Sequence, residues 1–140
     1  MKVYTDGACK GNPGLGGWGV YVESTGYKYS GKSNGFTTNN IMELTAIIRA
    51  LEITDGLKET VEIFSDSEYC LKGVTMWLAA WKSRGWVTAN GKPVKNKELW
   101  QKLDRLITGH TAKLRFTKVK AHSGIVGNEI ADKLAGGILD

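Results

Sequence analysis

The sequence lacks long apolar runs and closely spaced cysteines. No apolar stretch in its 140 residues approaches the roughly 20 residues that a membrane-spanning helix needs. The first residues also lack the apolar run of a signal peptide. Cys9 and Cys70 are far apart with no C-x-x-C spacing, which argues against a disulfide framework or a thiolate metal site. We therefore expect a cytoplasmic protein that does not enter membranes and has two ordinary, half-buried cysteines.

Proline and low-complexity sequence are also scarce. The chain has only two prolines and no visible internal repeat, which excludes fibrous and disordered classes. Its composition, 41% hydrophobic and 24% charged with five tryptophans, is instead typical of a globular protein. The length suits one hydrophobic core. We expect a single domain over residues 1–140, with a monomer as the default because no hydrophobic patch indicates a dimer.

Positive charge is concentrated in two segments. The net charge is +5, and residues 82–97 contain five cations and no acid. Residues 113–120 contain four more cations without an acid, whereas residues 52–68 contain six acids and one lysine. Such segments favour an anionic partner, including nucleic acid, although a solvated basic loop has the same composition.

Five segments have the β-branched and aromatic composition of strands, and turn residues separate the first three, which predicts an antiparallel meander. Two of the five are expected to be central strands that each deliver an aspartate at one end, namely Asp6 and Asp66. The predicted strands are residues 2–6, 17–24, 27–33, 61–66 and 113–119.

Apolar periodicity predicts helices between these strands. If Thr38 starts a helix, residues 44, 47, 48 and 51 form a buried stripe, and Glu43 lies on its border. Further helices are predicted over residues 69–81, broken near Gly73, and over residues 99–107. The last runs over residues 128–139, with Asp132 just beyond its apolar face. This order predicts an α/β fold, a mixed five-stranded sheet with three antiparallel strands first and helices on both faces.

Four acids are thus expected to face inward: Asp6, Glu43, Asp66 and Asp132. A buried carboxylate is costly unless a cation meets it. A shared metal site is one solution, but residue types alone leave others open. Asp6 and Asp66 could begin turns through their own side chains. Asp132 could be an exposed acid in the first turn of its helix, where the dipole favours negative charge.

Four blocks of sequence carry a more specific signal. They are YTDGACKGNPGLGGWG, TTNNIMELTAI, FSDSEY and KAHSGIVGNEIADKLA. In content, order and approximate separation they resemble the type 1 ribonuclease H family, in its bacterial form, along nearly the whole chain. The resemblance implies the ribonuclease H-like fold. It also implies an endonuclease that hydrolyses the RNA strand of RNA/DNA hybrids and leaves 5′-phosphate and 3′-hydroxyl ends.

By the same resemblance, Asp6, Glu43, Asp66 and Asp132 are a metal-binding set for two Mg²⁺ ions, with Mn²⁺ as a possible substitute. The chemistry fits, because two divalent ions can stabilise both the attacking and the leaving oxygen of a phosphodiester. Mg²⁺ prefers hard oxygen ligands over histidine or cysteine. Converging carboxylates should repel one another until cations arrive.

The resemblance also assigns residues around this set. His122 corresponds to an auxiliary histidine for proton transfer or product release, and His110 receives no role. Selection of RNA must depend on the 2′-hydroxyl. The residues implied to contact the hybrid, some through their backbone, are Cys9, Gly11, Asn12, Thr38, Asn39, Asn40 and Glu43. Alternatively, Asn39 and Asn40 could cap the helix, and both uses are compatible.

Two further features adjoin these blocks. Glu68 stands where several family members have glutamine, and an ionised carboxylate cannot donate a hydrogen bond. The segment 77–96 resembles the basic protrusion, around residues 82–97, that bacterial members use to hold the DNA strand. Its tryptophans could stack against that strand, although we expect at least one of Trp77, Trp81 and Trp86 in the core. Phosphate contacts are expected from Lys82, Arg84, Lys92 and Lys95.

Two other functions remain open from the sequence. The chain could be a hybrid-binding module with a vestigial active site, although the presence of all four acids argues against decay. It could also be a DNA nuclease or an integrase-like enzyme that shares the same sheet.

Overall fold

A central β-sheet organises residues 1–139, the part of the chain that the computed structural model describes. Asp140, the last residue of the expected domain, lies outside the described residues. The strands are β1 (Lys2–Lys10), β2 (Gly14–Val22), β3 (Tyr27–Thr37), β4 (Val61–Ser65) and β5 (Leu114–Lys118). Their order across the sheet is β3-β2-β1-β4-β5. The first three strands pair antiparallel, while β4 and β5 run parallel to β1, which confirms the predicted mixed sheet.

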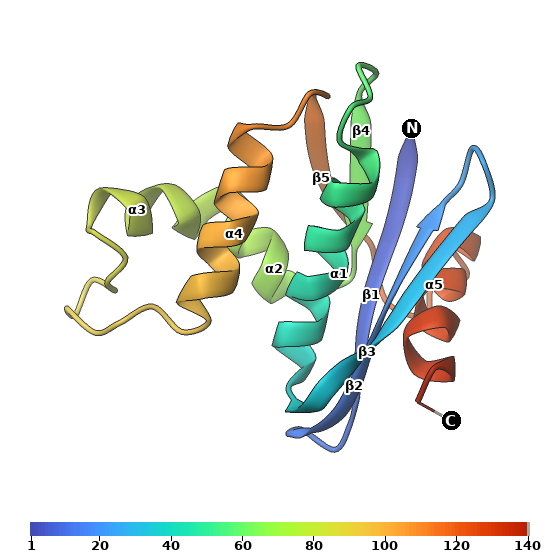
Figure 1. Ribbon diagram of the computed structural model, residues 1–140, viewed down its shortest axis with the longest axis horizontal. Helices are drawn as coiled ribbons and strands as arrows, with labels where there is room; N and C mark the ends of the chain where they lie inside the picture. The colour runs from blue at the N-terminus through green and yellow to red at the C-terminus, as the bar shows by residue number, and fades with distance from the viewer. Residues whose placement is uncertain (140) are drawn as a thin grey trace.

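Helices cover both faces of this sheet (Figure 1). Helix α1 (Asn39–Thr54) packs on β1 and β2, and α4 (Lys97–Thr108) packs against α1. Helix α5 (Val126–Gly137) covers β1 and β2 from the opposite side. The main core lies between α1, α4 and the sheet, where Leu44, Ile47, Leu51, Ile63 and Trp100 are fully buried. Within the described residues, no helix combines the length and apolar character needed to cross a membrane.

The strands are longer than predicted at the glycine-rich start of the sheet. β1 continues past Asp6 to Lys10, β2 begins at Gly14, and β3 continues to Thr37. The expectation that Asp6 ends its strand is therefore wrong. Glycines that suggest a turn lie in β2 because the helices approach its backbone closely: a side chain at Gly16 would meet Met42 of α1. Side chains at Gly17 and Gly19 would meet backbone atoms of α5.

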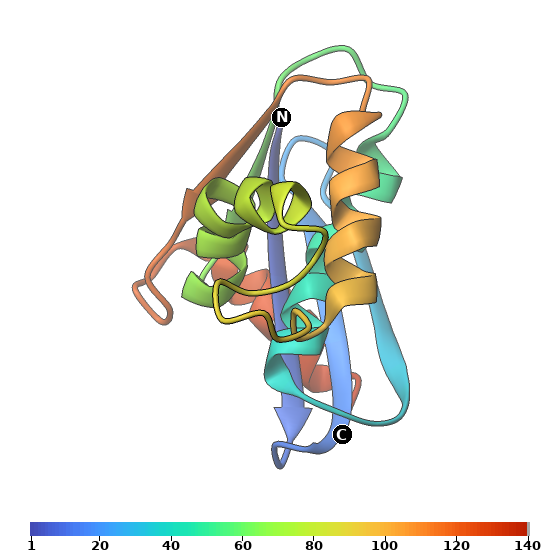
Figure 2. The same cartoon turned by 90° about the vertical axis from the view of Figure 1, so that its left-hand side faces the viewer.

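The second predicted helix changes its type at Gly73 instead of breaking. Helix α2 (Glu68–Lys72), the π-helix η1 (Gly73–Trp77) and α3 (Leu78–Ser83) follow one another without a gap. A π-helix has wider turns than an α-helix, because its hydrogen bonds join residues five apart. This widening occurs where the Trp100 ring of α4 occupies the space that a side chain at position 73 would fill. Helix α3 and the following loop project away from the sheet beyond α4 (Figure 1), and Figure 2 shows this projection end-on, in front of the sheet. This projection contains the basic segment predicted from the sequence.

Candidate functional site

Three carboxylates converge where β1 and β4 diverge. The parallel register pairs Tyr4 with Phe64 and then ends, so that two residues further on Asp6 and Asp66 stand at the same level. Asp6 is buried within β1, and Asp66 follows the last residue of β4 directly. Glu43 reaches the same place from α1. Ligand oxygens of these three acids lie within 4.8 Å of one another.

The backbone of β1 fixes Glu43 in this cluster. The Gly7 N–H donates a 2.7 Å hydrogen bond to Glu43 Oε1. Gly7 permits this approach because any side chain there would collide with the backbone of Met42 and Glu43. Helix α1 begins as predicted, with the Thr38 hydroxyl accepting a hydrogen bond from Ile41 N at 3.2 Å. The glycine therefore allows the helix to bring a carboxylate directly against the central strand.

Asp132 lies beside Asp6 but is not one of the three acids whose oxygens converge within 4.8 Å. It is half-buried on α5 and contributes, by its charge and by hydrogen bonding, to the raised pKa of Asp6. Helix α5 begins at Val126, two residues earlier than predicted, and Asp132 therefore lies in its second turn. The alternative that Asp132 is an exposed acid of the first turn is wrong, because Glu129 occupies that place.

The protonation of the cluster reflects its burial and crowding. Desolvation, followed by interactions with Asp132 and Asp66, raises the pKa of Asp6 to about 8. Desolvation and the charges of Asp6 and Asp66 likewise raise the pKa of Glu43 well above its usual value, while the Gly7 N–H opposes the shift. The metal-free cluster therefore retains protons near neutral pH. A divalent cation would stabilise the ionised carboxylates, and the all-oxygen donor set suits a hard ion such as Mg²⁺.

His122 remains separate from this cluster. Its side chain is exposed in the loop between β5 and α5, and its backbone has a positive φ of 54°. It does not belong to the group of ligand atoms that converge on Asp6 among residues 1–139. His110 instead has a structural position between α1 and the segment before β5. Its ring forms a hydrogen bond with the Thr54 hydroxyl at 3.1 Å and accepts one from Ala112 N at 3.0 Å.

Polar residues gather at the turn between β1 and β2 and at the start of α1. Asn12 Oδ1 accepts a hydrogen bond from Asn39 N at 3.1 Å, which links the two segments. The Asn39 and Asn40 side chains are exposed, and Thr38 caps the helix instead, so the alternative of asparagine caps is wrong.

The turn between β1 and β2 also contains Gly11, which has a positive φ of 74°. Cys9 Sγ donates to the carbonyl of Thr37 at 3.4 Å, which ties β1 to the end of β3.

Glu68 is exposed at the start of α2 and forms an ion pair with Lys72 at 2.8 Å. This lysine and, to a lesser degree, Lys118 lower the pKa of the Glu68 carboxyl group. At neutral pH the Glu68 carboxylate is therefore ionised, can only accept hydrogen bonds, and is paired with the Lys72 ammonium group.

An aromatic cluster supports the projecting segment. The Tyr69 and Trp100 rings are 5.5 Å apart, and Trp81 lies 5.3 Å from Trp100 and 5.7 Å from Trp77. The indole of Trp100 also donates to the Tyr69 hydroxyl at 3.0 Å. Trp77, Trp81 and Trp86 are all only half-buried. The prediction of a core residue among these three is wrong, because Trp100 from α4 fills the core instead.

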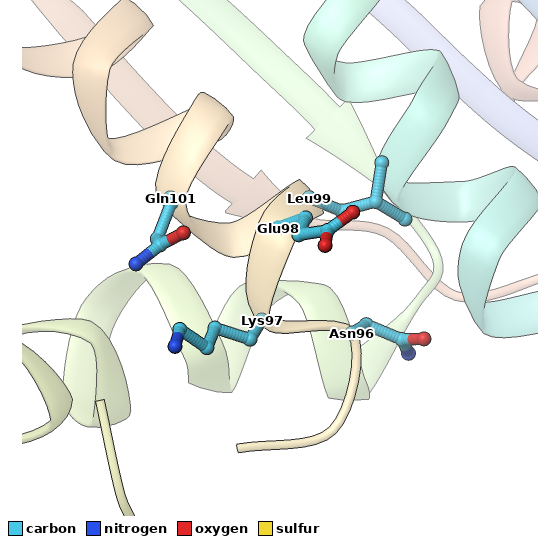
Figure 3. Close-up of a pocket in the computed structure, with 5 residues that line it drawn as sticks. All are labelled: Asn96, Lys97, Glu98, Leu99 and Gln101. Atoms are coloured by element: carbon cyan, nitrogen blue, oxygen red, sulfur yellow. The ribbon is translucent and has the colours of Figure 1, made fainter. Parts of the chain in front are cut away.

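The cations of the projection differ in their availability. Lys82 forms an ion pair with Asp104 at 3.2 Å, which occupies part of its charge. Arg84, Lys92 and Lys95 are exposed. A pocket of about 480 Å³ lies nearby, at the start of α4, and is lined by Asn96, Lys97, Glu98, Leu99 and Gln101 (Figure 3). This pocket contains none of the four candidate acids.

A groove next to Asp66 escaped the sequence analysis. It has a volume of about 550 Å³ and is lined by Asp66, Lys118, Val119, Lys120 and Ala121. The sequence contained a signal for it, because the cationic segment 113–120 overlaps a predicted strand. The parallel register pairs Ser65 with Lys118, which brings these lysines beside Asp66.

The mixed sheet with acids beside its central strand has the architecture of a ribonuclease H-like protein. The family model described as RNase H matches residues 1–138, and the chain belongs to the ribonuclease H family. One curated relative, the ribonuclease H of Cupriavidus pinatubonensis, is 52% identical over 138 residues and is aligned over 95% of this chain and 90% of its own length. The ribonuclease H of Ruthia magnifica is 48% identical, with 99% and 94% covered.

Solved structures agree with this assignment. LC9-RNase H1, described as a type 1 RNase H with the type 2 active-site motif, matches with a TM-score of 0.77 and 32% identity. That match covers 97% of this chain and 70% of LC9-RNase H1. LC11-RNase H1, solved in complex with an RNA/DNA hybrid, matches with a TM-score of 0.70 and 27% identity over 99% of both chains.

Proposed function

We propose that this chain is an endonuclease that hydrolyses the RNA strand of RNA/DNA hybrids and leaves 5′-phosphate and 3′-hydroxyl ends. The observation that carries the proposal is the convergence of Asp6, Glu43 and Asp66 within 4.8 Å, beside the central strand of a ribonuclease H family member. Residues 1–140 would form one catalytic domain that acts as a monomer. LC11-RNase H1, a structural neighbour, binds an RNA/DNA hybrid, which supports this choice of substrate.

The donor set fits a divalent cation. Gly7 engages one oxygen of Glu43, while the cluster retains further carboxylate oxygens from Asp6 and Asp66. These three residues, with Asp132 beside Asp6, would hold two Mg²⁺ ions, and Mn²⁺ is a possible substitute. When bound, the ions supply Lewis-acid stabilisation of charge on the attacking and departing oxygens.

The protein groups position the reactants and carry protons. The Gly7 N–H fixes the orientation of Glu43, so this carboxylate does not have to reorganise when substrate enters. Asp132 completes the acidic set from the opposite face of the sheet. His122, exposed on its loop, accepts or delivers a proton at an imidazole nitrogen and assists product release.

Recognition of the hybrid uses two surfaces. The polar turn formed by Asn12, Asn39 and Asn40, with the nearby backbone of Cys9 and Gly11, contacts 2′-hydroxyl groups, because an amide can donate and accept at once. Thr38 and Glu68 contribute acceptors on the same substrate. The projection holds the DNA strand through stacking on Trp77 and Trp81. Phosphate contacts come from Lys82, Arg84, Lys92 and Lys95.

Incubation with end-labelled substrates tests the proposal. We expect Mg²⁺-dependent cleavage of the RNA strand within a hybrid, inhibition by EDTA, and no cleavage of duplex DNA of the same sequence. Phosphatase and ligase treatment of the products should identify 5′-phosphate and 3′-hydroxyl ends. Preferential cutting of duplex DNA would establish a DNA nuclease of the same fold, and hybrid binding without turnover would establish a binding module.

A further inference from the structure

The groove beside Asp66 has a cationic wall opposite the acidic cluster. Its lining joins Asp66, a member of the three-acid group, to Lys118 and Lys120 at the end of β5. Lys118 is the last residue of β5, and Lys120 follows two positions later. Both side chains are exposed while Val119 between them is buried, so the two lysines lie on the same, exposed side of the backbone. An anionic chain that places one group at Asp66 would therefore bring its neighbouring groups to these lysines.

The backbone that carries the two lysines is firmly attached. Val119, between them, is buried, and its N–H donates to the carbonyl of Ser65 at 2.9 Å. Ser65 immediately precedes Asp66, and the register pairs it with Lys118. Ser123 Oγ donates to the carbonyl of Lys120 at 2.6 Å, which holds the start of the following loop. The positions of the lysines relative to Asp66 are thus set by the sheet itself.

The charges of Lys118 and Lys120 are available. Both side chains are exposed, and neither forms an ion pair within residues 1–139, whereas Lys72, Lys82 and Lys102 each contact a carboxylate. Lys118 also lowers the pKa of the Glu68 carboxyl group, although less than Lys72 does. Exposed, unpaired ammonium groups beside a nuclease centre match the phosphates of a nucleic acid backbone.

We propose that Lys118 and Lys120 bind phosphates of the RNA strand next to the bond that is cleaved. This inference rests on the proposed function, because Asp66 belongs to the centre that acts on the RNA strand. The neighbouring phosphates in the groove must then belong to that strand, while the DNA strand is held elsewhere by the projection. The two lysines are substrate-positioning residues that fix the register of the RNA over the carboxylates.

The test compares two double variants with the same change in charge. Lys118→Ala/Lys120→Ala removes the groove cations, and Lys58→Ala/Lys113→Ala removes two exposed cations near the opposite ends of β4 and β5. We expect the groove variant to raise the KM for a hybrid about tenfold, with kcat changed less than threefold. Hybrid binding is then measured in the Asp6→Asn background. The slope of the logarithm of the binding constant against the logarithm of salt concentration should become shallower by about one for each lysine removed. The control variant should behave like the unaltered protein.

A second measurement locates the contact. Single uncharged methylphosphonates replace individual RNA phosphates on either side of the cleavage point. At the contacted positions they should weaken binding by the unaltered protein but not by the groove variant, because the same interaction is already lost. Equal losses for both proteins at every position would overturn the proposal.

The groove proposal and the proposed function fail in different ways. If the unaltered protein cuts hybrids but the groove and control variants have equal KM values and salt slopes, the groove proposal alone is wrong. If the unaltered protein cuts no hybrid, the proposed function is wrong. Thermal unfolding of each variant checks folding, and Lys118→Gln/Lys120→Gln provides a second charge-removing pair if alanine lowers stability.

Discussion

At the scale of single residues, the candidate site depends on the absence of a side chain at Gly7 and on the placement of the Glu43 carboxylate against the central strand. Gly7 allows α1 to approach β1, and the resulting hydrogen bond holds Glu43 beside Asp6. The cost is a crowded set of acids whose charges are poorly solvated. A divalent cation that binds such a set of acids in the folded state should raise the free energy of unfolding.

Substitution of Asp6→Asn should separate catalysis from stability. The pKa of Asp6 is raised to about 8 in the folded protein, so the folded state binds this proton more tightly than the unfolded state. Without metal, the contribution of this proton to the free energy of unfolding is therefore fully present at low pH. That contribution is lost as pH rises from about 4 towards 8. An amide in place of this carboxyl group carries no charge, so the variant should gain on the order of 2 kcal/mol over the unaltered protein at pH 8 in EDTA. Cleavage of hybrid should be abolished, with hybrid binding retained.

Thermal unfolding at pH 5 and pH 8, with and without Mg²⁺, measures this effect. We expect the variant to melt about 5 °C higher at pH 8 in EDTA, and the difference to shrink at pH 5 or with Mg²⁺. Glu98→Gln, an exposed acid at the start of α4, is the matched control and should change little. A melting temperature of the unaltered protein that is independent of pH and metal would contradict the prediction.

The sequence contained most of the residue-level information about the acids but not their geometry. Local pattern placed Glu43 on the border of a buried stripe, and that placement is confirmed by its bond to Gly7. The same reasoning ended β1 at Asp6, because it could not see that the glycines of β2 pair with β1 as far as Lys10. Lys118 was missed as a groove residue because its position depends on a pairing with β4 that is distant in sequence.

At the scale of elements, a contact between distant segments lies at the base of the projection. Gly73 lies at the start of the π-helix η1, and the Trp100 ring of α4 occupies the space beside it. Trp100 also bonds Tyr69 and contacts Trp81, so the base of the projection is fixed to α4. Periodicity predicted α4 well because its apolar stripe is local. It did not predict the π-helix, where Gly73 packs against a ring that comes from a helix much further along the chain.

Substitution of Gly73→Ala tests this contact. The new methyl group would collide with the Trp100 ring, which should cost about 2 to 3 kcal/mol of folding free energy. The KM for hybrid should rise more than kcat falls, because the projection would shift while the acids on β1 and α1 remain in place. Thermal unfolding and steady-state kinetics measure the two effects.

Gly136→Ala is the matched control, since a side chain there meets nothing within 4 Å and alanine favours a helix. It should leave stability equal or slightly raised. Equal melting temperatures for both alanine variants would show that Trp100 does not constrain Gly73.

At the scale of the whole molecule, the distribution of charge matters more than the net charge of +5. Acids gather at the centre of the sheet, while cations line the projection and the groove beside Asp66. The predicted order of strands and helices is confirmed. Side-chain caps mark the starts of α1 and α2, at Thr38 and Ser67.

Removal of Lys92 and Lys95 tests the projection separately from the groove. Both side chains are exposed, unlike Lys82, whose pairing with Asp104 would complicate the result. We expect Lys92→Ala/Lys95→Ala to weaken hybrid binding and to reduce the salt slope by about two, with little change in kcat. Fluorescence anisotropy across a salt series measures the slope, and Lys58→Ala/Lys113→Ala again serves as control. A slope equal to that of the control would remove the projection from the binding surface.

The four proposed catalytic acids enter the chain in the order β1, α1, the residue after β4, and α5. The last of them, Asp132, follows all five strands and the other described helices along the chain. A chain that lacks α5 retains Asp6, Glu43 and Asp66 in its sequence but not Asp132. Proteolytic removal of α5 should therefore abolish the proposed nuclease activity while it spares the three acids that converge beside β1.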